Sequence, residues 1–328
     1  MIEAYSNSIG VVVIGRNEGD RLKQCICSLS MFARIIYVDS GSSDGSVEWA
    51  QGEGIDVVEL SLNLRFTAAR ARNAGFARLL ELAPQLEYVQ FIDGDCVLDQ
   101  NWPRRAVDYL SDRENVCAVF GRRRERYPDR SIYNQLCDHE WNVPVGKARS
   151  CGGDVMMRVK SLETAGGYRD DLIAGEEPEL CVRLRARGWL IWRIDEEMTL
   201  HDAAIMRFEQ WWRRHVRSGY AFANGAHLHG SPPERLWVWE SRRAILWGLI
   251  IPFVCACLTL AFGFPGLLAF LIYPLQLGRR ILHIPGAWRV RVQLAFFELL
   301  SRFPESIGQL RFVRDSLLQV PSRIIEYK

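Results

Sequence analysis

The sequence predicts an α/β protein in which a mainly parallel sheet is flanked by helices and followed by a C-terminal apolar helical hairpin and amphipathic helices. Two patterns carry this prediction. Over the first 200 residues, short β-branched runs alternate with helical segments, which is typical of βαβ units. Residues 244–264 then carry no charge, and this length is sufficient to cross a bilayer core of about 30 Å. A chain of 328 residues has room for both parts.

The strands are predicted from short apolar runs, and the helices from apolar residues that recur on one face. Ile9–Ile14 is an uninterrupted apolar, β-branched run and is therefore a buried strand. Apolar residues at helical spacing predict a helix over 17–29, and Pro84 ends another that covers 66–82. The remaining predicted strands are 34–38, 57–60, 88–92 and 190–194, and a further helix covers 46–52.

The charge balance excludes a general nucleic-acid binder. Lys and Arg number 41 and Asp and Glu 39, a formal net charge of +2, whereas nucleic-acid binding needs a strong basic field. The charge is unevenly distributed, because the segment from Arg279 to Lys328 holds nine basic and four acidic residues. Such a basic segment is typical of a surface that faces anionic lipid.

The cysteines indicate a cytosolic or membrane setting, and the N-terminus a cytosolic first domain. Nine cysteines are scattered without a C-x-x-C pair, which disfavours a zinc ribbon, and we expect all nine to be reduced. The first ten residues lack the basic and apolar regions of a signal peptide, so we expect the first domain to remain in the cytosol.

Residues 244–277 form the predicted apolar hairpin. Arg242–Arg243 and Arg279–Arg280 flank it, and arginines at both ends predict that both ends face the cytosol. A re-entrant or interfacial hairpin is an alternative, because the second run is short and contains Pro274. A buried core helix of a soluble protein is a further alternative.

The hairpin sets the predicted domain division. Residues 1–230 form a catalytic domain, and 231–328 form a membrane-associated helical region whose basic tail covers 279–328. Within that tail, 288–300 has the pattern of an amphipathic helix on a membrane surface. The alternative is an ordinary helix that packs on the catalytic domain.

Asp93 and Asp95 follow a predicted strand in the segment FIDGDC. Two carboxylates separated by one small residue at a strand end can hold Mg²⁺ or Mn²⁺, since hard divalent cations prefer oxygen ligands. On its own this pattern is weak, because it also occurs in turns and helix caps.

The segment VDSGSSDGS, residues 38–46, also follows a strand and leads into a helix. Glycine and serine permit a tight turn with exposed backbone N–H groups, which suits a phosphate or nucleotide at Ser40 and its neighbours. Asp39 can accept a hydrogen bond from a base, and Asp44 can do the same or cap the helix. No G-x-G-x-x-G or Walker lysine is present, which excludes a Rossmann dehydrogenase and a P-loop NTPase.

Three carboxylates precede or begin a helix in GEEPE, residues 175–179. Part of this pattern is a first-turn charge effect. A carboxylate close to other carboxylates can also have a raised pKa, which suits a general base.

Taken together, residues 10 to about 219 resemble the family 2 glycosyltransferases with the GT-A fold. Besides the three segments above, VVVIGRNEG, ARARNAG and the run from Gly152 to Trp189 are similar to family segments, in the same order. The resemblance implies an inverting, metal-dependent, hexosyltransferase-type enzyme that uses a UDP- or GDP-linked sugar.

The resemblance also implies roles for individual residues. Asp39 would read the base, with Ser40, Asp44 and Asp93 also on the nucleotide. Arg72 and Asn73 would hold the nucleotide end. Asp95, with Asp93 nearby, would bind Mg²⁺ or Mn²⁺, which neutralises the departing diphosphate. The family's acidic motif has Asp at its second position. Here that residue is Glu177, so the base is Glu177 or Glu176, with Glu177 preferred.

Three further features follow the acidic motif or lie beside it. His201 can complete the metal shell, with Asp202 orienting it, or it can be an ordinary buried histidine. QWWRR, residues 210–214, resembles the Q-x-x-R-W signature of processive synthases but ends in Arg214 instead of Trp, which favours transfer of one sugar per encounter. Arg122–Arg126 lies near the diphosphate or an anionic acceptor, or forms a solvated face.

The sequence therefore predicts a glycosyltransferase at the cytoplasmic face of the cell membrane. Its expected partners are a nucleotide sugar, a lipid-linked or envelope glycan acceptor and membrane lipid, with no nucleic acid. The alternatives are a catalytically inactive scaffold with this fold and a nucleotidyltransferase that makes sugar nucleotides. The latter is disfavoured because its N-terminal G-x-G-T-R signature is missing.

Overall fold

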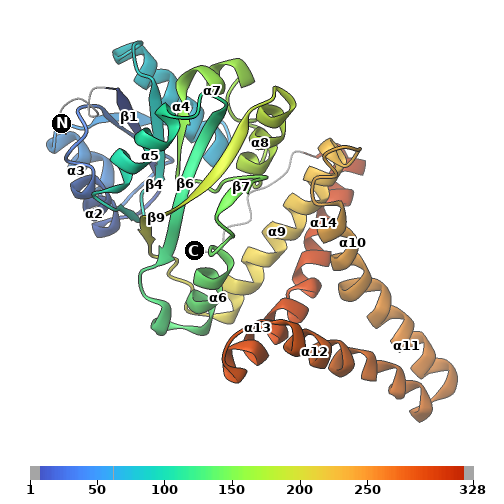
Figure 1. Ribbon diagram of the computed structural model, residues 1–328. Coiled ribbons are helices and arrows are strands. Elements are labelled where there is room, and N and C mark those ends of the chain that lie inside the picture. The colour runs from blue at the N-terminus through green and yellow to red at the C-terminus, as the bar shows by residue number, and fades with distance from the viewer. Residues whose placement is uncertain (1–7, 62, 321–328) are drawn as a thin grey trace. The chain divides into compact units, whose positions relative to one another are not determined.

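The computed structural model describes residues 8–61 and 63–320, and the chain divides into two compact units between Met206 and Arg207. The first unit is built on a mixed sheet with helices on both faces, and the second is helical (Figure 1). The predicted helix-flanked sheet, followed by a C-terminal apolar helical region, is confirmed.

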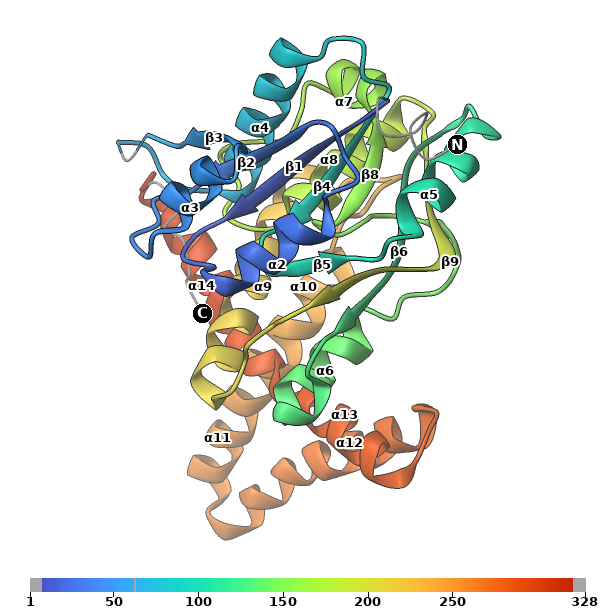
Figure 2. The same ribbon diagram turned by 90° about the vertical axis from the view of Figure 1, so that its left-hand side faces the viewer.

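The sheet of the first unit has the strand order β3-β2-β1-β4-β8-β6-β9-β5, with β7 paired to β9. Strands β1 to β4 pair in parallel, whereas β8 pairs antiparallel with both β4 and β6, and β5 and β7 pair antiparallel with β9 (Figure 2). The strands are β1 (Ile9–Gly15), β2 (Ile35–Asp39), β3 (Asp56–Glu59), β4 (Tyr88–Asp93), β5 (Cys96–Leu98), β6 (Val116–Glu125), β7 (Gly146–Ala148), β8 (Val155–Arg158) and β9 (Leu190–His201).

Close packing fixes the helices of this unit against the sheet. At Gly75 on α4, an added Cβ would lie 2.4 Å from Cγ1 of Val12 on β1, so only glycine permits this approach. The resulting position of α4 brings Arg72 toward the carboxyl end of the sheet. The helices are α2 (Asp20–Ser28), α3 (Ser46–Gly52), α4 (Ala68–Leu82), η1 (Pro128–Arg130), α5 (Trp102–Ser111), α6 (Ile132–Glu140), α7 (Val159–Ala165) and α8 (Glu176–Ala186).

Two predicted helix starts differ from the structure for local reasons. Helix α2 begins at Asp20 rather than residue 17, because Asn17 and Gly19 have positive φ angles of 54° and 52° that a helix does not accommodate. Helix α4 begins at Ala68, where the hydroxyl of Thr67 accepts a hydrogen bond from the backbone N–H of Arg70 at 3.1 Å.

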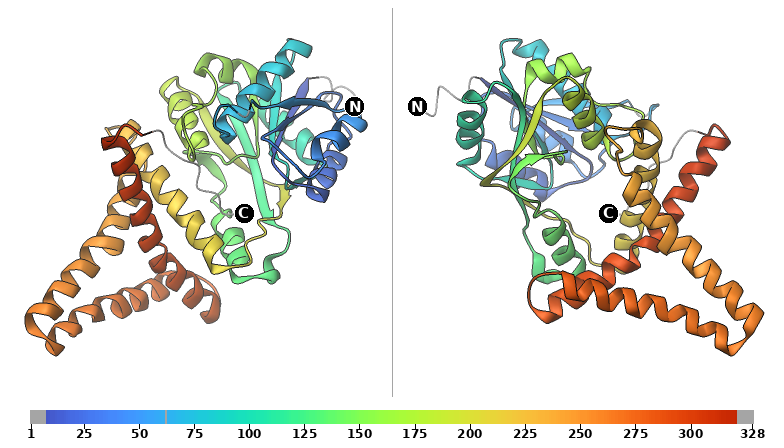
Figure 3. Two further views of the ribbon diagram at one scale, coloured as in Figure 1. Left: turned by 180° about the vertical axis from the view of Figure 1, so that it is seen from behind. Right: turned by 45° about the vertical axis from the view of Figure 1, so that its right-hand side comes forward.

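The second unit consists of helices, among which the hairpin segments follow one another with short breaks (Figure 3). One helix in the described part of the chain, Val238–Phe262, is long and apolar enough to cross a membrane, and only 6% of its most apolar stretch is buried. The elements are α9 (Phe208–His229), α10 (Val238–Ile245), η2 (Leu246–Ile250), α11 (Ile251–Phe262), η3 (Phe264–Leu271), α12 (Ile272–His283), α13 (Trp288–Leu300) and α14 (Arg302–Leu317).

Helix α9 belongs to the second unit, although the sequence placed it in a catalytic domain ending at residue 230. The reason is its packing on α14. Added Cβ atoms at Gly219 and Gly308 would lie 2.0 Å from backbone oxygens of the opposite helix. Such small residues let helix backbones approach closely. The part of the predicted basic tail from 321 to 328 lies outside the described residues.

Helix α14 buries several polar side chains and exposes several apolar ones, although Arg311 and Arg314 are exposed as well. Its buried positions include Arg302, Glu305 and Gln309, whereas Leu310 and Leu317 are 46% and 79% exposed. Exposed apolar side chains also cover the hairpin, among them Leu260, Phe262, Phe264 and Leu268. So many exposed leucines and phenylalanines are unusual in the helices of a water-soluble protein.

The predicted reduced cysteines are all free thiols in the structure. Cys27 and Cys257 are exposed, and the other seven are buried.

Candidate functional site

The carboxyl ends of β1, β2 and β4 bring the predicted acidic residues to one edge of the sheet. In the parallel registers, Gly15 of β1 pairs with Asp39 of β2, and Ile14 pairs with Asp93 of β4. Asp39 and Asp93 therefore lie on either side of the end of β1. Ligands of open α/β sheets bind at such an edge.

Asp39 is buried, and its carboxylate organises the turn that follows. Oδ1 accepts a hydrogen bond from the Tyr37 hydroxyl, and Oδ2 accepts from the backbone N–H groups of Gly41 and Ser42, each at 2.8 Å. The half-buried Ser40 donates its backbone N–H to the carbonyl of Gly15 at 3.1 Å. The loop is thus held in one conformation by its own acidic residue.

Asp44 lies at the other end of this loop. Its Oδ1 accepts from the backbone N–H of Ser46 at 3.1 Å, at the start of α3. Burial alone would raise the pKa of Asp44, but the hydrogen bonds from Ser46 outweigh it and lower this pKa. A cavity of about 260 Å³ adjoins the loop and is lined by Asp44, Ser46, Lys23 and Trp49 among others.

Arg72 joins three acidic residues at the sheet edge. Its guanidinium lies 3.0 Å from carboxylate oxygens of Asp93, Glu176 and Glu177. Gly153 makes room for it, since an added Cβ there would lie 2.3 Å from Nη2 of Arg72. Arg72 is therefore a buried counter-charge to the acidic residues.

Glu176 and Glu177 occupy the first turn of α8, which begins after Gly175 in a left-handed conformation with φ 85°. Burial raises the pKa of Glu177 to about 7, and the neighbouring charge of Glu176 adds to the rise while Arg72 opposes it. A carboxyl group with this pKa can take up a proton near neutral pH.

Asp93 lies between two arginines. Arg72 binds Oδ1 at 3.0 Å, and Arg123 binds Oδ2 at 3.1 Å. Burial would raise the pKa of Asp93, but Arg72 and Arg123 lower it, so the group stays ionised. Arg123 also lies 3.4 Å from Asp154 and stacks over the ring of Trp141 at 4.9 Å.

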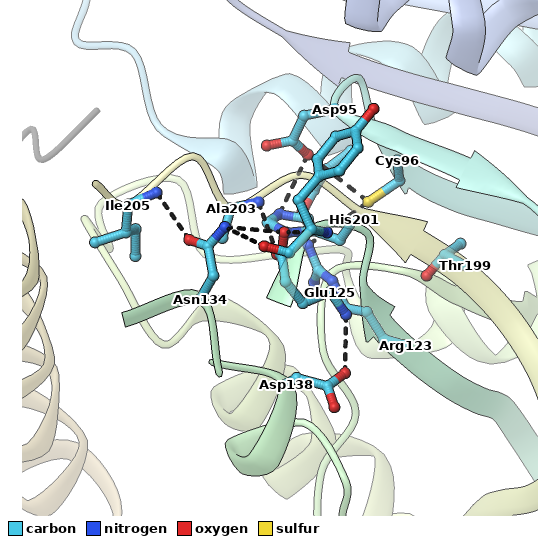
Figure 4. Close-up of polar contacts among 12 residues, drawn as sticks. Asp95, Cys96, Arg123, Glu125, Asn134, Asp138, Thr199, His201, Ala203 and Ile205 are labelled. Carbon is cyan, nitrogen blue, oxygen red and sulfur yellow. Dashed lines mark hydrogen bonds and ion pairs between the residues drawn. The ribbon is translucent and has the colours of Figure 1, made fainter. Parts of the chain in front are cut away.

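Asp95 and His201 come together because β5 pairs antiparallel with β9, with Cys96 opposite His201. Nε2 of His201 lies 3.3 Å from Oδ1 of Asp95. Ligand atoms of Asp95, Cys96 and His201 all lie within 4.8 Å of one another, and Figure 4 shows the three residues grouped. A carboxylate oxygen and an imidazole nitrogen suit Mn²⁺ or Mg²⁺.

Cys96 is the member of this group that sequence reasoning missed. Burial raises the pKa of its thiol well above the usual value, and the thiol donates to Oδ2 of Asp154 at 3.2 Å. It is thus a neutral thiol beside the oxygen and nitrogen ligands. Its position directly after Asp95 was the available signal.

Asn73 lies apart from the acidic cluster. Its amide donates to the carbonyl of Tyr168 at 2.8 Å and to Asp170 at 2.7 Å, and it accepts from the backbone N–H of Tyr168. These bonds tie α4 to the segment that precedes α8.

The arginine run 122–126 divides between two environments. Arg122 is buried, and Arg123 reaches the site, whereas Arg124 pairs with Glu197 at the surface. The sequence placed the whole run either near the site or in solvent. The register of β6 against β9 is irregular on both sides of Arg122, so these side chains do not follow a simple alternation.

Comparison with known proteins finds relatives of the first unit. Residues 10–162 match the model of Glycosyl transferase family 2. Glycosyltransferase AglE of Haloferax volcanii is 22% identical over 209 residues, covering 60% of this chain and 67% of that protein. Succinoglycan biosynthesis protein ExoA of Rhizobium meliloti is 25% identical over 212 residues, covering 59% and 63%. The match to ExoA thus spans less than two thirds of that relative.

Two solved structures share the fold. The mannosyltransferase PcManGT from Pyrobaculum calidifontis, in complex with GDP-mannose and Mn²⁺, superposes with a TM-score of 0.59 at 17% identity, covering 92% of this chain and 87% of that one. Glucosyl-3-phosphoglycerate synthase from Mycobacterium tuberculosis, with Mn²⁺, UDP-glucose and phosphoglyceric acid, gives 0.50 at 20% identity, covering 70% and 83%.

Proposed function

We propose that this chain, whose residues 10–162 match the model of Glycosyl transferase family 2, is a metal-dependent inverting hexosyltransferase. The donor is a UDP- or GDP-linked sugar, and the acceptor is a lipid-linked or envelope glycan. One observation carries the proposal. A pair of metal-type ligands, Asp95 and His201, and a glutamate with a pKa of about 7, Glu177, belong to the same acidic edge of the sheet.

The donor end of the reaction rests on the loop after β2 and on the Asp95–His201 pair. The loop and Asp39 would border the nucleotide, and Asp95 with His201 would hold the cation. When bound, Mg²⁺ or Mn²⁺ neutralises charge on the departing diphosphate. The donor complexes of the two structural neighbours, with GDP-mannose or UDP-glucose and Mn²⁺, support this donor class.

The acceptor hydroxyl is activated by a residue at the start of α8. Glu177 takes the proton of the acceptor hydroxyl as that oxygen attacks the anomeric carbon of the donor sugar. Arg72 holds Glu176 and Glu177 in place and lowers their mutual repulsion. Glu176 is less suited to proton transfer because it is 4% exposed, so an acceptor reaches it less readily.

Donor binding is tested by thermal shift of the full chain with UDP- and GDP-linked sugars, with and without Mn²⁺. We expect one donor to raise the melting temperature only with metal, and to release its nucleoside diphosphate when acceptor is present. Asp95→Asn should abolish the metal-dependent shift. No stabilisation by any donor, with metal present, would contradict the proposal.

For the second unit we propose insertion into a membrane at its cytoplasmic face. The uncharged hairpin and the exposed leucines of α14 support this proposal, because exposed leucines and phenylalanines are favourable in lipid and costly in water. Arginines at both ends of the hairpin place both ends on the cytosolic side. The break at Gly263, between α11 and η3, is consistent with a chain that turns back.

Membrane insertion is tested by flotation with liposomes followed by a high-salt wash. Burial of about 20 apolar residues makes insertion effectively irreversible, so salt should not release the protein. Release by salt alone would mean that only basic side chains hold it, and would contradict insertion of the hairpin.

A further inference from the structure

Glu125, the last residue of β6, is a buried carboxylate surrounded by hydrogen-bond donors. Its Oε1 accepts from the backbone N–H of Tyr127 at 3.0 Å and from the Asn134 amide at 3.2 Å. Its Oε2 accepts from the backbone N–H of Ala203 at 3.0 Å. All three neighbours are donors, so both oxygens of Glu125 act as hydrogen-bond acceptors.

The imidazole of His201 lies between Glu125 and Asp95 (Figure 4). On one side Nε2 is 3.3 Å from Oδ1 of Asp95, and on the other Nδ1 is 3.9 Å from Oε2 of Glu125. Among the described residues, Nδ1 is a buried nitrogen without a hydrogen-bond partner. A displacement of about 1 Å would bring it to hydrogen-bond distance of Glu125.

We propose that Glu125 is a positioning residue for the metal site. With a cation bound, Oε2 of Glu125 would accept a hydrogen bond from Nδ1–H of the His201 imidazole, and this would leave the lone pair of Nε2 for the cation beside Asp95. Ligating histidines commonly donate their other ring nitrogen to a carboxylate, which sets the ring orientation and raises the basicity of the ligand. The inference rests on the proposed function, because it assigns His201 to the cation.

The same carboxylate also fixes the backbone that follows His201. Glu125 binds the N–H of Ala203, and Asn134, which Glu125 holds, accepts from the N–H of Ile205 at 3.1 Å. Ser131 completes this arrangement by donating to the carbonyl of Ile205. The segment 203–205, which follows His201, is therefore anchored to one buried group beside the imidazole.

Mn²⁺ affinity of the full chain tests the assignment with a readout other than turnover. The free ion is measured by electron paramagnetic resonance, with Mn²⁺ alone and with Mn²⁺ plus nucleoside diphosphate. Glu125→Gln presents an NH₂ group to neighbours that are all donors, and we expect 10- to 100-fold weaker Mn²⁺ binding, the range typical of such partners. Glu197→Gln is the matched control. It removes a carboxylate from the same β6–β9 pair, where Glu197 binds Arg124 at the surface, and it should leave the affinity unchanged.

A double-mutant cycle separates positioning from a general structural role. In a His201→Ala background, Glu125→Gln should cause no further loss of Mn²⁺ affinity, because its effect passes through the imidazole. An equal loss in both backgrounds, or a lowered melting temperature with unchanged Mn²⁺ affinity, would overturn the assignment. Wild-type protein that binds no Mn²⁺, either alone or with nucleoside diphosphate, would contradict the proposed function itself, and with it the assignment.

The wild-type protein provides a test that does not depend on the folding of a variant. With ¹⁵N-labelled histidine and saturating Mg²⁺, nuclear magnetic resonance should show His201 with its proton on Nδ1. A proton on Nε2 alone would overturn the proposal.

Discussion

Arg72 determines the electrostatics of the acidic edge at the scale of single residues. One buried guanidinium meets Asp93, Glu176 and Glu177, so three carboxylates share one positive charge. This shortage of counter-charge, together with burial, explains why the pKa of Glu177 rises while that of Asp93, which has Arg123 as well, falls. Two carboxylates bound to the same arginine are thus suited to different tasks.

Replacing Glu177 by Gln tests its assignment as the base. The amide keeps the size of the side chain but cannot accept a proton, so kcat should fall by roughly 10² or more. Binding of the donor, measured by thermal shift, should persist. Glu176→Gln is the control, since Glu176 binds the same arginine. An active Glu177→Gln enzyme and an inactive Glu176→Gln enzyme would move the role to Glu176.

The raised pKa of Glu177 also predicts a pH dependence. A base works only when deprotonated, so kcat should fall about tenfold per pH unit below a pKa of about 7 and level off above it. The folded-state pKa lies above the ordinary value of glutamate, so the stability linked to this group is lost as pH rises through about 7. As pH rises, the free energy of unfolding of the wild type should therefore fall relative to that of Glu177→Gln. A kcat that does not fall as pH is lowered below about 7 would contradict the assignment.

The sequence identified most acidic residues of the site but not their partners. Asp93, Asp95 and Glu177 follow recognisable strand ends or motifs, whereas Arg72 and Glu176 are 104 positions apart and meet only in the folded chain. Glu125, Asn134 and Asp154 had no sequence signal, because a buried carboxylate is recognisable only from the donors around it. Asn73 was assigned to the nucleotide, yet its amide is fully engaged with the segment 168–170.

At the scale of elements, one arginine of each pair that flanks the hairpin binds a carboxylate, and the other binds none among the described residues. Arg243 and Arg280 both bind Glu298 of α13, Arg243 at 2.7 Å. Arg242 and Arg279 are exposed and make no ion pair with any described residue. The sequence could not distinguish the members of a pair, since only the position of Glu298 does so.

This division predicts different consequences for neighbouring substitutions. Changing Arg242 and Arg279 together to Gln should reduce partitioning onto vesicles with anionic lipid by roughly 10- to 30-fold, because each cation near such a surface contributes about 1 kcal/mol. Sedimentation with vesicles of stated phosphatidylserine content measures this. The melting temperature should stay unchanged.

The matched variant replaces Arg243 and Arg280 with Gln. It removes the same charge but leaves Glu298 without its partners, so it should lower the melting temperature of the second unit. Equal vesicle binding by wild type and the Arg242/Arg279 variant would show that these side chains do not face lipid.

Regular elements with strong local patterns were predictable, and the others were not. Helix α3 has the predicted bounds, 46–52, and the first four strands were found within about two residues. Strands β5 to β8 were not predicted, because three of them are only three or four residues long and all four pair with strands distant in sequence. The helix 288–300 was predicted with its exact bounds, but its polar and apolar residues are not cleanly separated, since Ala295 is its one buried residue.

At the scale of the whole molecule, every residue assigned to donor, metal or base lies in the first unit, which ends at Met206. We expect a fragment of residues 1–206 to fold and to bind the metal–nucleotide pair with the affinity of the full chain. A fragment that ends at 243 retains α9 without α14, and its exposed helix should promote aggregation. Thermal shift and light scattering of the two fragments measure this. A folded 1–206 fragment that cannot bind nucleotide would contradict the division.

The native chain can be labelled selectively at its own exposed cysteines. Cys27 on α2 and Cys257 on α11 are the two exposed thiols, one in each unit. In lipid, a membrane-impermeant maleimide should modify Cys27 and spare Cys257, and detergent should make both reactive. A pair of spin labels or fluorophores at these positions would then report the separation of the two units, without any engineered cysteine.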